Sequence, residues 1–289
     1  MPSTSPIVVL DSGLGGLTVV KALRSAMPHE DIIYFGDTAR LPYGAKSTET
    51  VTAFVQQIIS YLMPFEPKHV VIACNTATAL ALPAIRLAYP NLSISGVVEP
   101  GAKAAVAAAG AKQFPVIGIL ATEATIRSKA YEQAIHRRRN RARLILRPTP
   151  LLVPIIEDGR DENDPLVCLA LQQYLQPLIQ RGLDVLVLGC THYPIYKNLI
   201  AAMLGGDTAV IDSAEQCAQD VGRRLAAGGM LRSGLAGSGG RVHCFVTDDP
   251  VRFARLSPRF LGESIPQPTL VLPDLLYDMR TSVALRAAS

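Results

Sequence analysis

The sequence contains little cysteine and few charged residues, and each shortage excludes a class of protein. Its 289 residues include five cysteines, no two of which form a C-x-x-C pair. That is too few for a disulfide scaffold, and we expect a chain from a reducing, cytoplasmic compartment. Charged residues make up 18% and hydrophobic residues 49%, which excludes a disordered chain and predicts a substantial core. The length corresponds to about two average domains.

Long apolar runs and a strong net charge are also missing. No uncharged apolar stretch reaches the roughly 18 residues that a membrane helix needs, and residues 1–6 lack the pattern of a signal peptide. The formal net charge is +4, but five arginines lie in one run at residues 136–143 (HRRRNRAR), without which the chain would be slightly acidic. We therefore expect that run on a solvated helix end or loop, and we expect neither a nucleic-acid nor a membrane partner.

Short apolar runs alternate with segments of helical periodicity, which is typical of α/β proteins with parallel sheets. The predicted strands cover residues 7–10, 32–35, 70–73, 115–120, 144–147, 185–188 and 242–246. The predicted helices cover residues 18–27, 48–63, 75–89, 122–135, 166–180 and 250–261. Pro83 lies inside one of them and predicts a kink or a later start. Residues 228–241 are rich in Gly and Ser, which predicts a surface loop.

The two halves of the chain resemble each other. Residues 70–76 (VVIACNT) and 185–191 (VLVLGCT) each show a buried strand, a small residue, a cysteine and a threonine before a helix or turn. Asp11 precedes Cys74 by 63 residues, and Thr122 precedes Cys190 by 68. We predict that one βα lobe was duplicated, with a thiol after the corresponding strand of each copy.

Polar residues follow the predicted strands, where ligands bind in open parallel sheets. They are Asp11 and Ser12, Asp37, residues 74–76, Thr122 and residues 190–192. The turn at residues 11–16 (DSGLGG) lacks the last glycine of a dinucleotide motif, because Thr18 stands there. We interpret it as a tight turn whose backbone N–H groups approach a small carboxylate.

The two strand-end cysteines need help to act as bases. A thiol with a pKa of about 8.5 must shift by about 2 units, or roughly 2.7 kcal/mol, to be mostly ionised at neutral pH. A helix N-terminus supplies only about 0.3–1 kcal/mol. A neighbouring base is therefore needed, and Asp11 and His192 are the candidates, one for each lobe. The remaining cysteines lack this setting and are expected to be packing residues: Cys168, Cys217 and Cys244.

A zinc site would be a competing use of cysteine and histidine. Cys190 and His192 are two positions apart, but no second close pair accompanies them, so we expect no metal. The other histidines are expected at the surface or in structural roles: His29, His69, His136 and His243.

Four segments together closely resemble the glutamate racemases. They are residues 11–16 (DSGLGG), 35–44 (FGDTARLPYG), 73–78 (ACNTAT) and 189–194 (GCTHYP). Their order and spacing also fit, and the likeness extends over nearly the whole chain. Weaker likenesses lie at residues 121–125, 152–157 and 211–215. The arginine run, the loop at 228–241 and the residues at 247–249 depart from the family pattern.

This resemblance implies an α/β fold of two pseudo-symmetric lobes, with mostly parallel sheets flanked by helices and the active site between the lobes. Residues 1–97 with 211–289 would form the first lobe, and residues 98–210 the second. The implied enzyme interconverts L- and D-glutamate without a cofactor and supplies D-glutamate for peptidoglycan synthesis, and so serves cell wall biogenesis and cell shape. Its implied partners are the small-molecule substrate and a second copy in a homodimer.

The same resemblance implies a role for each site residue. Cys74 would take the α-proton from D-glutamate with help from Asp11, and Cys190 would take it from L-glutamate with help from His192. Two further carboxylates match supporting catalytic roles: Asp37 and Glu157. Besides Asp11 and His192, the residues that match substrate contacts are Ser12, Tyr43, Gly44, Asn75, Thr76, Thr122 and Thr191.

The chemistry agrees with this resemblance. Enantiomers have equal free energy, so the enzyme must work in both directions, and a pair of acid/base groups does so. Backbone N–H groups with Ser, Thr and Asn side chains could stabilise the developing carbanion.

Three other interpretations remain open. A sister racemase of the same fold would act on another amino acid such as aspartate, but the four motifs together favour glutamate. A cysteine-nucleophile hydrolase or lyase would leave the second thiol idle. A non-catalytic protein would engage DNA or a topoisomerase through the arginine run.

Overall fold

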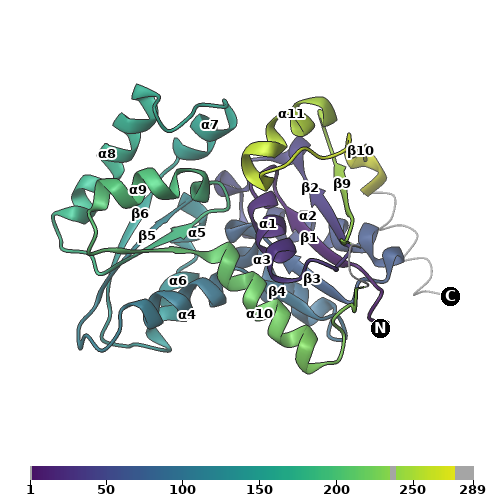
Figure 1. Ribbon diagram of the computed structural model, residues 1–289, viewed down its shortest axis with the longest axis horizontal. Coiled ribbons are helices and arrows are strands. Elements are labelled where there is room, and N and C mark those ends of the chain that lie inside the picture. The colour runs from purple at the N-terminus through teal and green to yellow at the C-terminus, as the bar shows by residue number, and fades with distance from the viewer. Residues whose placement is uncertain (1, 235–238, 277–289) are drawn as a thin grey trace.

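Two parallel β-sheets organise the chain (Figure 1), which the computed structural model describes over residues 2–234 and 239–276. The first sheet has the strand order β10-β9-β2-β1-β3-β4, and the second has the order β6-β5-β7-β8. The strands of the first sheet are β1 (Ile7–Asp11), β2 (Ile32–Gly36), β3 (His69–Ile72), β4 (Ile94–Gly96), β9 (Val242–Val246) and β10 (Thr269–Leu270). Those of the second are β5 (Val116–Ala121), β6 (Arg143–Pro148), β7 (Val185–Gly189) and β8 (Ala209–Asp212).

Helices cover these sheets, and short 3-10 turns join some of the elements. The helices around the first sheet are α1 (Leu17–Ala26), α2 (Thr48–Leu62), α3 (Asn75–Ala88) and α11 (Pro250–Leu261). Those around the second sheet are α4 (Val98–Ala108), α5 (Glu123–Arg127), α6 (Ala130–His136), α7 (Leu152–Glu157), α8 (Pro165–Ile179) and α9 (Lys197–Leu204), and α10 (Ser213–Ala227) follows the last strand of that sheet. The 3-10 turns are η1 (Thr38–Arg40), η2 (Tyr43–Ala45), η3 (Met63–Phe65) and η4 (Tyr193–Tyr196).

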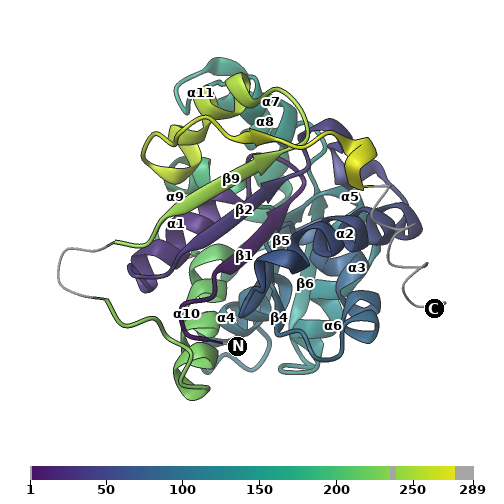
Figure 2. The same ribbon diagram turned by 90° about the vertical axis from the view of Figure 1, so that its right-hand side faces the viewer.

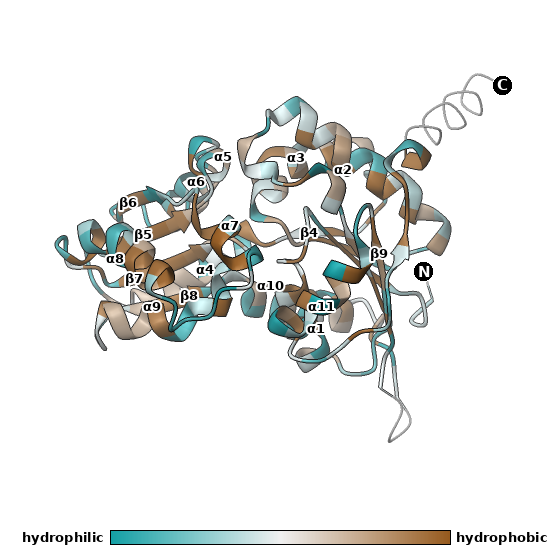
Figure 3. Ribbon diagram, turned by 90° about the horizontal axis from the view of Figure 1, so that it is seen from above, coloured by the Kyte–Doolittle hydropathy of each residue, from teal (hydrophilic) through white to brown (hydrophobic). Residues whose placement is uncertain are grey.

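Strand β1 shows why its sequence is apolar at every position before Asp11. Ile7 and Val9 contribute to a core shared with α1, whereas Val8 and Leu10 contribute to a core shared with α2 and α3. Successive side chains of a strand point to opposite faces, and here both faces are covered. The strands of both sheets are accordingly hydrophobic (Figure 3).

The two sheets share one topology. The order β2-β1-β3-β4 in the first sheet corresponds to β6-β5-β7-β8 in the second, strand for strand. Cys74 therefore follows the third strand of the first sheet, and Cys190 follows the third strand of the second. The repeat predicted from the sequence is present in the fold, and the predicted class of two parallel-sheet lobes is confirmed.

Several elements differ from the sequence-based prediction. All seven predicted strands are present, but β4, β8 and β10 were not predicted, because they are short edge strands of two to four residues. The predicted helix at 122–135 is split into α5 and α6 at Lys129, whose positive φ of 58° interrupts the helical path. Helix α3 runs through Pro83 and starts at Asn75, so the proline does not delay it.

The sheets divide the chain near the predicted lobe boundaries. Helix α4 packs on β7 and α6, and its Val98 and Ala102 belong to the core of the second sheet. Strand β8 ends at Asp212 in the second sheet, two residues beyond the predicted boundary at 210. Helix α10 contacts both α1 and α4 and so runs between the two parts (Figure 1). The chain then returns to the first sheet as β9, which lies beside β2 (Figure 2), and as β10, which pairs with β9 at the edge. Residues 235–238 of the predicted loop and 277–289 of the predicted first lobe lie outside the described residues.

Candidate active site

The carboxyl ends of the strands in both sheets bring the predicted residues together. Asp11 is the last residue of β1, and one residue separates Cys74 from the end of β3, while Cys190 directly follows β7. Both thiols are buried, with 6% and 7% exposure. Nearby, a cavity of about 390 Å³ is lined from both sheets, by Gly44 on one side and by Thr122 and Glu157 on the other, among others.

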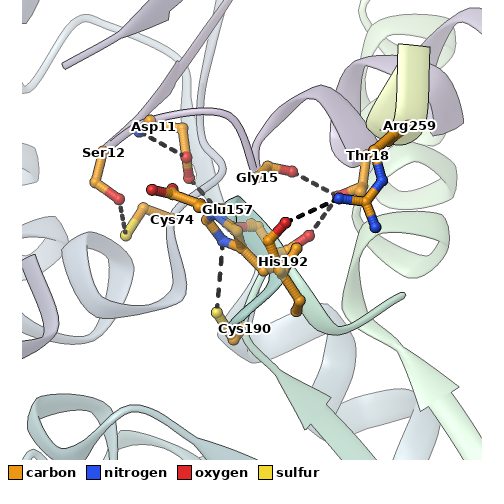
Figure 4. Close-up of polar contacts among 12 residues, drawn as sticks. Asp11, Ser12, Gly15, Thr18, Cys74, Glu157, Cys190, His192 and Arg259 are labelled. Carbon is orange, nitrogen blue, oxygen red and sulfur yellow. Dashed lines mark hydrogen bonds and ion pairs between the residues drawn. The ribbon is translucent and has the colours of Figure 1, made fainter. Parts of the chain in front are cut away.

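Cys74 caps the first turn of α3. Its Sγ accepts a hydrogen bond from the backbone N–H of Ala77 at 3.5 Å and lies 3.7 Å from Oγ of Ser12 (Figure 4). Burial raises the pKa of the Cys74 thiol to about 12, the negative charge of Asp11 adds to this, and the contacts with Ala77 and Ser12 oppose it. The Cys74 side chain therefore holds its proton in this structure.

Asp11 is completely buried, and its oxygens are engaged on both sides. Oδ2 accepts from the backbone N–H of Gly13 at 3.0 Å, and Oδ1 accepts from the hydroxyl of Thr191 at 3.4 Å. Burial raises the pKa of Asp11, and the positive charge of His192 opposes that rise. The hydrogen bonds of Asp11 go to Gly13 and Thr191 and not to Cys74. Asp11 therefore acts on the Cys74 thiol through its charge alone.

Cys190 begins a chain of sulfur, imidazole and carboxylate. Nδ1 of His192 lies 3.9 Å from Sγ of Cys190, and Nε2 lies 2.9 Å from Oε1 of Glu157 (Figure 4). Burial would lower the pKa of His192, but the hydrogen bonds and charges of Cys190 and Glu157 outweigh it and raise this pKa to about 10. Although burial raises the pKa of Glu157, its contact with His192 brings it below the usual value. A protonated His192 is thus placed to stabilise a negative sulfur at Cys190.

Asp37 is also fully buried, and its carboxylate holds the segment that includes Gly44. Nε of Arg40 donates to both carboxylate oxygens at 2.9 and 2.8 Å, Thr247 donates to Oδ1 at 3.0 Å, and the hydroxyl of Tyr43 donates to Oδ2. These contacts fix the turn η2, which lines the cavity. The geometry gives Asp37 a positioning role beside the site.

Threonine hydroxyls join the two lobes next to Cys74. Oγ1 of Thr76 lies 2.9 Å from Oγ1 of Thr122 and 3.2 Å from Oγ1 of Thr125. A Cβ added at Gly44 would lie 2.9 Å from Cβ of Thr122, so the turn η2 packs closely on the second lobe. Two of the predicted substrate contacts, Thr76 and Thr122, thus meet across the lobes.

Asn75 has an open donor. Its Oδ1 accepts a hydrogen bond from the hydroxyl of Tyr131 at 2.7 Å, whereas its Nδ2 is buried and has no hydrogen-bond partner within the described part of the chain. Leaving a buried polar group unpaired costs about 1–3 kcal/mol. An acceptor such as a carboxylate would relieve that cost.

Gly15 explains why the turn after β1 is rich in glycine. A Cβ at this position would lie 2.3 Å from Oγ1 of Thr191 and 2.4 Å from Nδ1 of His192. The hydroxyl of Thr18, the residue that breaks the dinucleotide motif, donates to the carbonyl of Thr191 at 3.1 Å. The turn therefore lets the strand ends of the two lobes approach each other.

A model of the Asp/Glu/Hydantoin racemase family matches residues 17–221. The chain belongs to this family. It is 44% identical over 256 residues to a glutamate racemase of Geobacter metallireducens, which covers 89% of this chain and 92% of that relative.

Solved structures of the family are similar over nearly the whole chain. Glutamate racemase RacE1 of Bacillus anthracis has a TM-score of 0.87 at 36% identity and covers 94% of this chain and 99% of its own. The Francisella tularensis enzyme, solved in complex with D-glutamate, has a TM-score of 0.84 at 34% identity and covers 93% of this chain and 98% of its own. The resemblance inferred from the four motifs is therefore confirmed.

Sequence reasoning missed the residues that support this racemase-family site from other elements. They are Thr18, Tyr131, Thr149, Arg252 and Arg259. None stands directly beside one of the predicted cysteines, and no local pattern marks them. Only Thr149 carried a signal, because it follows the end of β6, in the place that Asp37 takes after β2.

Over residues 2–234 and 239–276, no group of three or more His, Cys, Asp or Glu side chains is arranged to hold a metal ion. Within the same ranges, no helix combines the length and the apolar character needed to cross a membrane.

Proposed function

We propose that this protein is a glutamate racemase that moves the α-proton of glutamate between two thiols without a cofactor. The observation that carries the proposal is the placement of Cys74 and Cys190 after equivalent strands of two matching sheets. Proton transfer on opposite faces of one carbon requires two such groups. The Geobacter metallireducens relative and the Bacillus anthracis structure are glutamate racemases.

The two thiols have different neighbours in the proposed cycle. His192, whose pKa is raised, faces Cys190, whereas buried Cys74 beside Asp11 keeps its proton. With L-glutamate bound, Cys190 takes the α-proton and Cys74 delivers its own proton to the opposite face. D-glutamate forms, and the reverse reaction starts with the negative sulfur on Cys74.

Asp11 and Glu157 support these two steps from opposite lobes. Asp11, whose pKa is raised by burial, sets the electrostatic field at Cys74. Glu157 holds the imidazole that faces Cys190. Asp37 supports the reaction indirectly by fixing the turn at Gly44. Each charge is thus arranged before substrate arrives, which is how preorganised sites lower a barrier.

The polar groups around the thiols form the proposed substrate site. Nδ2 of Asn75 is free to donate to a substrate carboxylate, and it lies in the first turn of α3, where backbone N–H groups favour an anion. The remaining contacts that we assign to substrate are Ser12, Tyr43, Gly44, Thr76, Thr122, Thr191, Asp11 and His192.

The cellular assignment follows from membership of the family. We place the enzyme in the cytoplasm, where it supplies D-glutamate for peptidoglycan and so serves cell wall biogenesis and cell shape. We assign residues 1–97 with 211–289 to one lobe and residues 98–210 to the other. The division of strands between the sheets supports this assignment, apart from β8, which runs to Asp212 in the second sheet. The proposed assembly is a homodimer.

Solvent exchange tests this function directly. The purified enzyme is incubated in D2O with L- or D-glutamate, without pyridoxal phosphate, and in parallel with both enantiomers of aspartate. We expect α-deuterium incorporation and loss of optical rotation from either enantiomer of glutamate, and no comparable exchange with aspartate. Failure with glutamate overturns the proposal, and exchange with aspartate alone identifies the sister racemase. A Cys74→Ala/Cys190→Ala double variant is the control for contaminating activity.

A further inference from the structure

Helix α11 belongs to the first lobe but supports the acid/base group of the second. It follows β9 and packs on α1, and its Phe253 lies against Tyr34 with ring centroids 6.0 Å apart. Two turns further along the same face, Phe260 reaches the second lobe, where its ring and that of His192 pack edge to face with centroids 5.5 Å apart and an interplanar angle of 87°. One helix thus contacts the core behind β1 and the imidazole next to Cys190.

Two arginines of α11 donate to backbone carbonyls at the end of α7. Nη1 of Arg259 donates to the carbonyl of Ile156 at 2.9 Å, and its Nη2 donates to the carbonyl of Arg160. Nη2 of Arg252 donates to the carbonyl of Glu157 at 3.2 Å. Figure 4 draws Arg259 in the same close-up as Glu157 and His192.

The carbonyls of Ile156 and Glu157 lie in the last turn of α7, and that of Arg160 lies in the turn after it. Ile156 also accepts from the backbone N–H of Gly159 at 3.0 Å, and Arg160 from the hydroxyl of Tyr196 at 2.9 Å. The last four carbonyls of any α-helix have no acceptor role within the helix, and α7 has only six residues. A guanidinium presents several N–H donors in a rigid plane, and its charge strengthens each hydrogen bond. Arg259 therefore fixes the end of α7 and the turn after it, whereas a lysine could not span both carbonyls with the same geometry.

The position of this helix end decides where His192 lies. Glu157 is the last residue of α7, and its carboxylate contacts Nε2 of His192, whose Nδ1 faces Cys190. We propose that Arg259 is a positioning residue: through the end of α7 it keeps Glu157, and therefore His192, aligned with Cys190. The inference rests on the proposed racemase function and adds a residue from the opposite lobe to one of its two half-reactions.

Arg259 supports the residues around Cys190 and not those around Cys74, so its effect on the two proton transfers can be measured separately. Cys74 has its contacts with Ser12 and Ala77 and none of the α7 groups among them. Because the two enantiomers have equal free energy, kcat/KM must change equally in both directions. A slower transfer at Cys190 shows instead in the substrate deuterium isotope effects. The effect from α-deuterated L-glutamate rises, since Cys190 removes that deuteron, and the effect from α-deuterated D-glutamate falls, since its limiting step becomes protonation by Cys190.

The experiment compares Arg259→Met and Arg259→Lys with the wild-type enzyme. Arg255→Met is the matched control, because Arg255 is an exposed arginine of the same helix. We expect Arg259→Met to lower kcat/KM by about 10- to 100-fold, with the opposite changes in isotope effect described above. We expect Arg259→Lys to lose less activity than Arg259→Met, and Arg255→Met to keep the wild-type kcat/KM. In a further variant, Arg259→Ala, we expect added millimolar guanidinium to restore part of the activity.

A second measurement does not depend on turnover. The imidazole of His192 is titrated by NMR in the wild type and in Arg259→Lys, and we expect its pKa to move from about 10 toward 6.5 in the variant. An unchanged kcat/KM in Arg259→Met overturns the proposal. So does a loss with unchanged isotope effects and an unchanged titration, which would make Arg259 only a structural tie. A wild-type enzyme that fails to racemise glutamate contradicts the proposed function instead, and the titration still tests the positioning.

Discussion

Cys74 and Cys190 are the same side chain in two electrostatic settings. Asp11 places a negative charge near Cys74, while His192 places a positive charge near Cys190. The strand-end position is equivalent in both lobes, so the difference arises from the residues that the neighbouring turns contribute. The two equivalent thiols therefore differ in the charged residue beside them, which is Asp11 for Cys74 and His192 for Cys190.

Replacing either thiol tests whether both act on the proton. We expect Cys74→Ser and Cys190→Ser each to lower the racemisation rate by about 10²- to 10⁴-fold, because a hydroxyl is a much weaker acid than a thiol and is almost never ionised near neutral pH. Cys168→Ser is the control, since this partly exposed side chain donates to the carbonyl of Glu162 away from the site. The measurement is the initial rate from each enantiomer, and full activity in either strand-end variant would rule out the two-thiol mechanism.

The close approach at Gly15 predicts a strong effect from one methyl group. Gly15→Ala places Cβ against Thr191 and His192 at distances no real contact shows, so the two strand ends must separate. We expect a loss of about 1–3 kcal/mol in unfolding free energy and a larger fall in kcat, measured by denaturant unfolding and by racemisation. Gly206→Ala is the control, because nothing lies within 4 Å of its added Cβ. Equal behaviour of the two variants would contradict this account.

At the scale of elements, the site residues lie where helices begin or end, and short edge strands hold the neighbouring strands in place. Edge strand β4 is held to β3 by pairing and by His69, which lies between the hydroxyls of Ser93 and Ser95 at 2.8 and 2.9 Å. Helix α3 starts at the thiol of Cys74, and α7 ends at the carboxylate that holds His192. Chemistry therefore depends on where elements begin and end, and packing of the elements fixes those points.

His69 predicts a pH dependence of stability that comes from the tie between β3 and β4. Burial, helped by the charge of Arg224 and opposed by that of Asp220, lowers the pKa of His69 from 6.5 to about 4. Folding therefore favours the neutral ring, so its stabilisation is present above pH 6.5 and is lost as the pH falls from 6.5 toward 4. The loss is at most roughly 3 kcal/mol.

Denaturant unfolding at several pH values across that window measures this effect. As the pH is lowered, we expect the unfolding free energy of the wild type to fall more steeply than that of His69→Gln. The difference between the two slopes corresponds to at most one proton taken up on unfolding. Equal slopes in the two proteins would show that His69 does not titrate in this way.

At the scale of the whole molecule, buried and surface charges have different functions. The ion pair of Lys68 and Glu30 is buried, and Lys68 also donates to the carbonyls of Ser3 at 2.6 Å and Met230 at 2.9 Å. It fastens the chain leaving α10 to the first lobe. The arginine run, in contrast, lies on the surface just after α6, where it was expected.

Three arginines of the run at residues 136–143 contact other residues of the second lobe. Arg137 and Arg138 pair with Glu99, and Arg139 donates to the carbonyls of Gly110 and Lys112 at 2.7 and 2.8 Å. Such exposed contacts contribute about 0–1 kcal/mol each. These arginines are therefore engaged locally and lie away from the thiols.

Neutralising the run tests its separation from catalysis. We expect Arg137→Gln/Arg138→Gln/Arg139→Gln to keep kcat and KM for glutamate near the wild-type values, with a small fall in Tm. The same variant and the wild type are compared for binding to duplex DNA, where we expect no stable complex from either. A large loss of turnover would mean that the run contributes to the site, and tight DNA binding that the triple variant loses would support a nucleic-acid partner.

The sequence by itself determined the family, the parallel α/β class, the internal repeat and the positions of both thiols. These features depend on local patterns, since a buried strand followed by a small residue and a cysteine spans only about seven positions. Strands β4 and β8 and the division of the helix at 122–135 escaped prediction because short edge strands and a single positive φ leave little periodic signal.

Only the tertiary structure decided which side chains meet between the lobes. Gly15 faces Thr191 and His192, Tyr131 pairs with Asn75, and Arg259 reaches Ile156 from 103 positions away. The physical reason is that these contacts depend on how two separately formed sheets pack and on where their strands end. Hydrophobic periodicity determines which face of an element is buried, but the partners across the lobes follow from the packing alone.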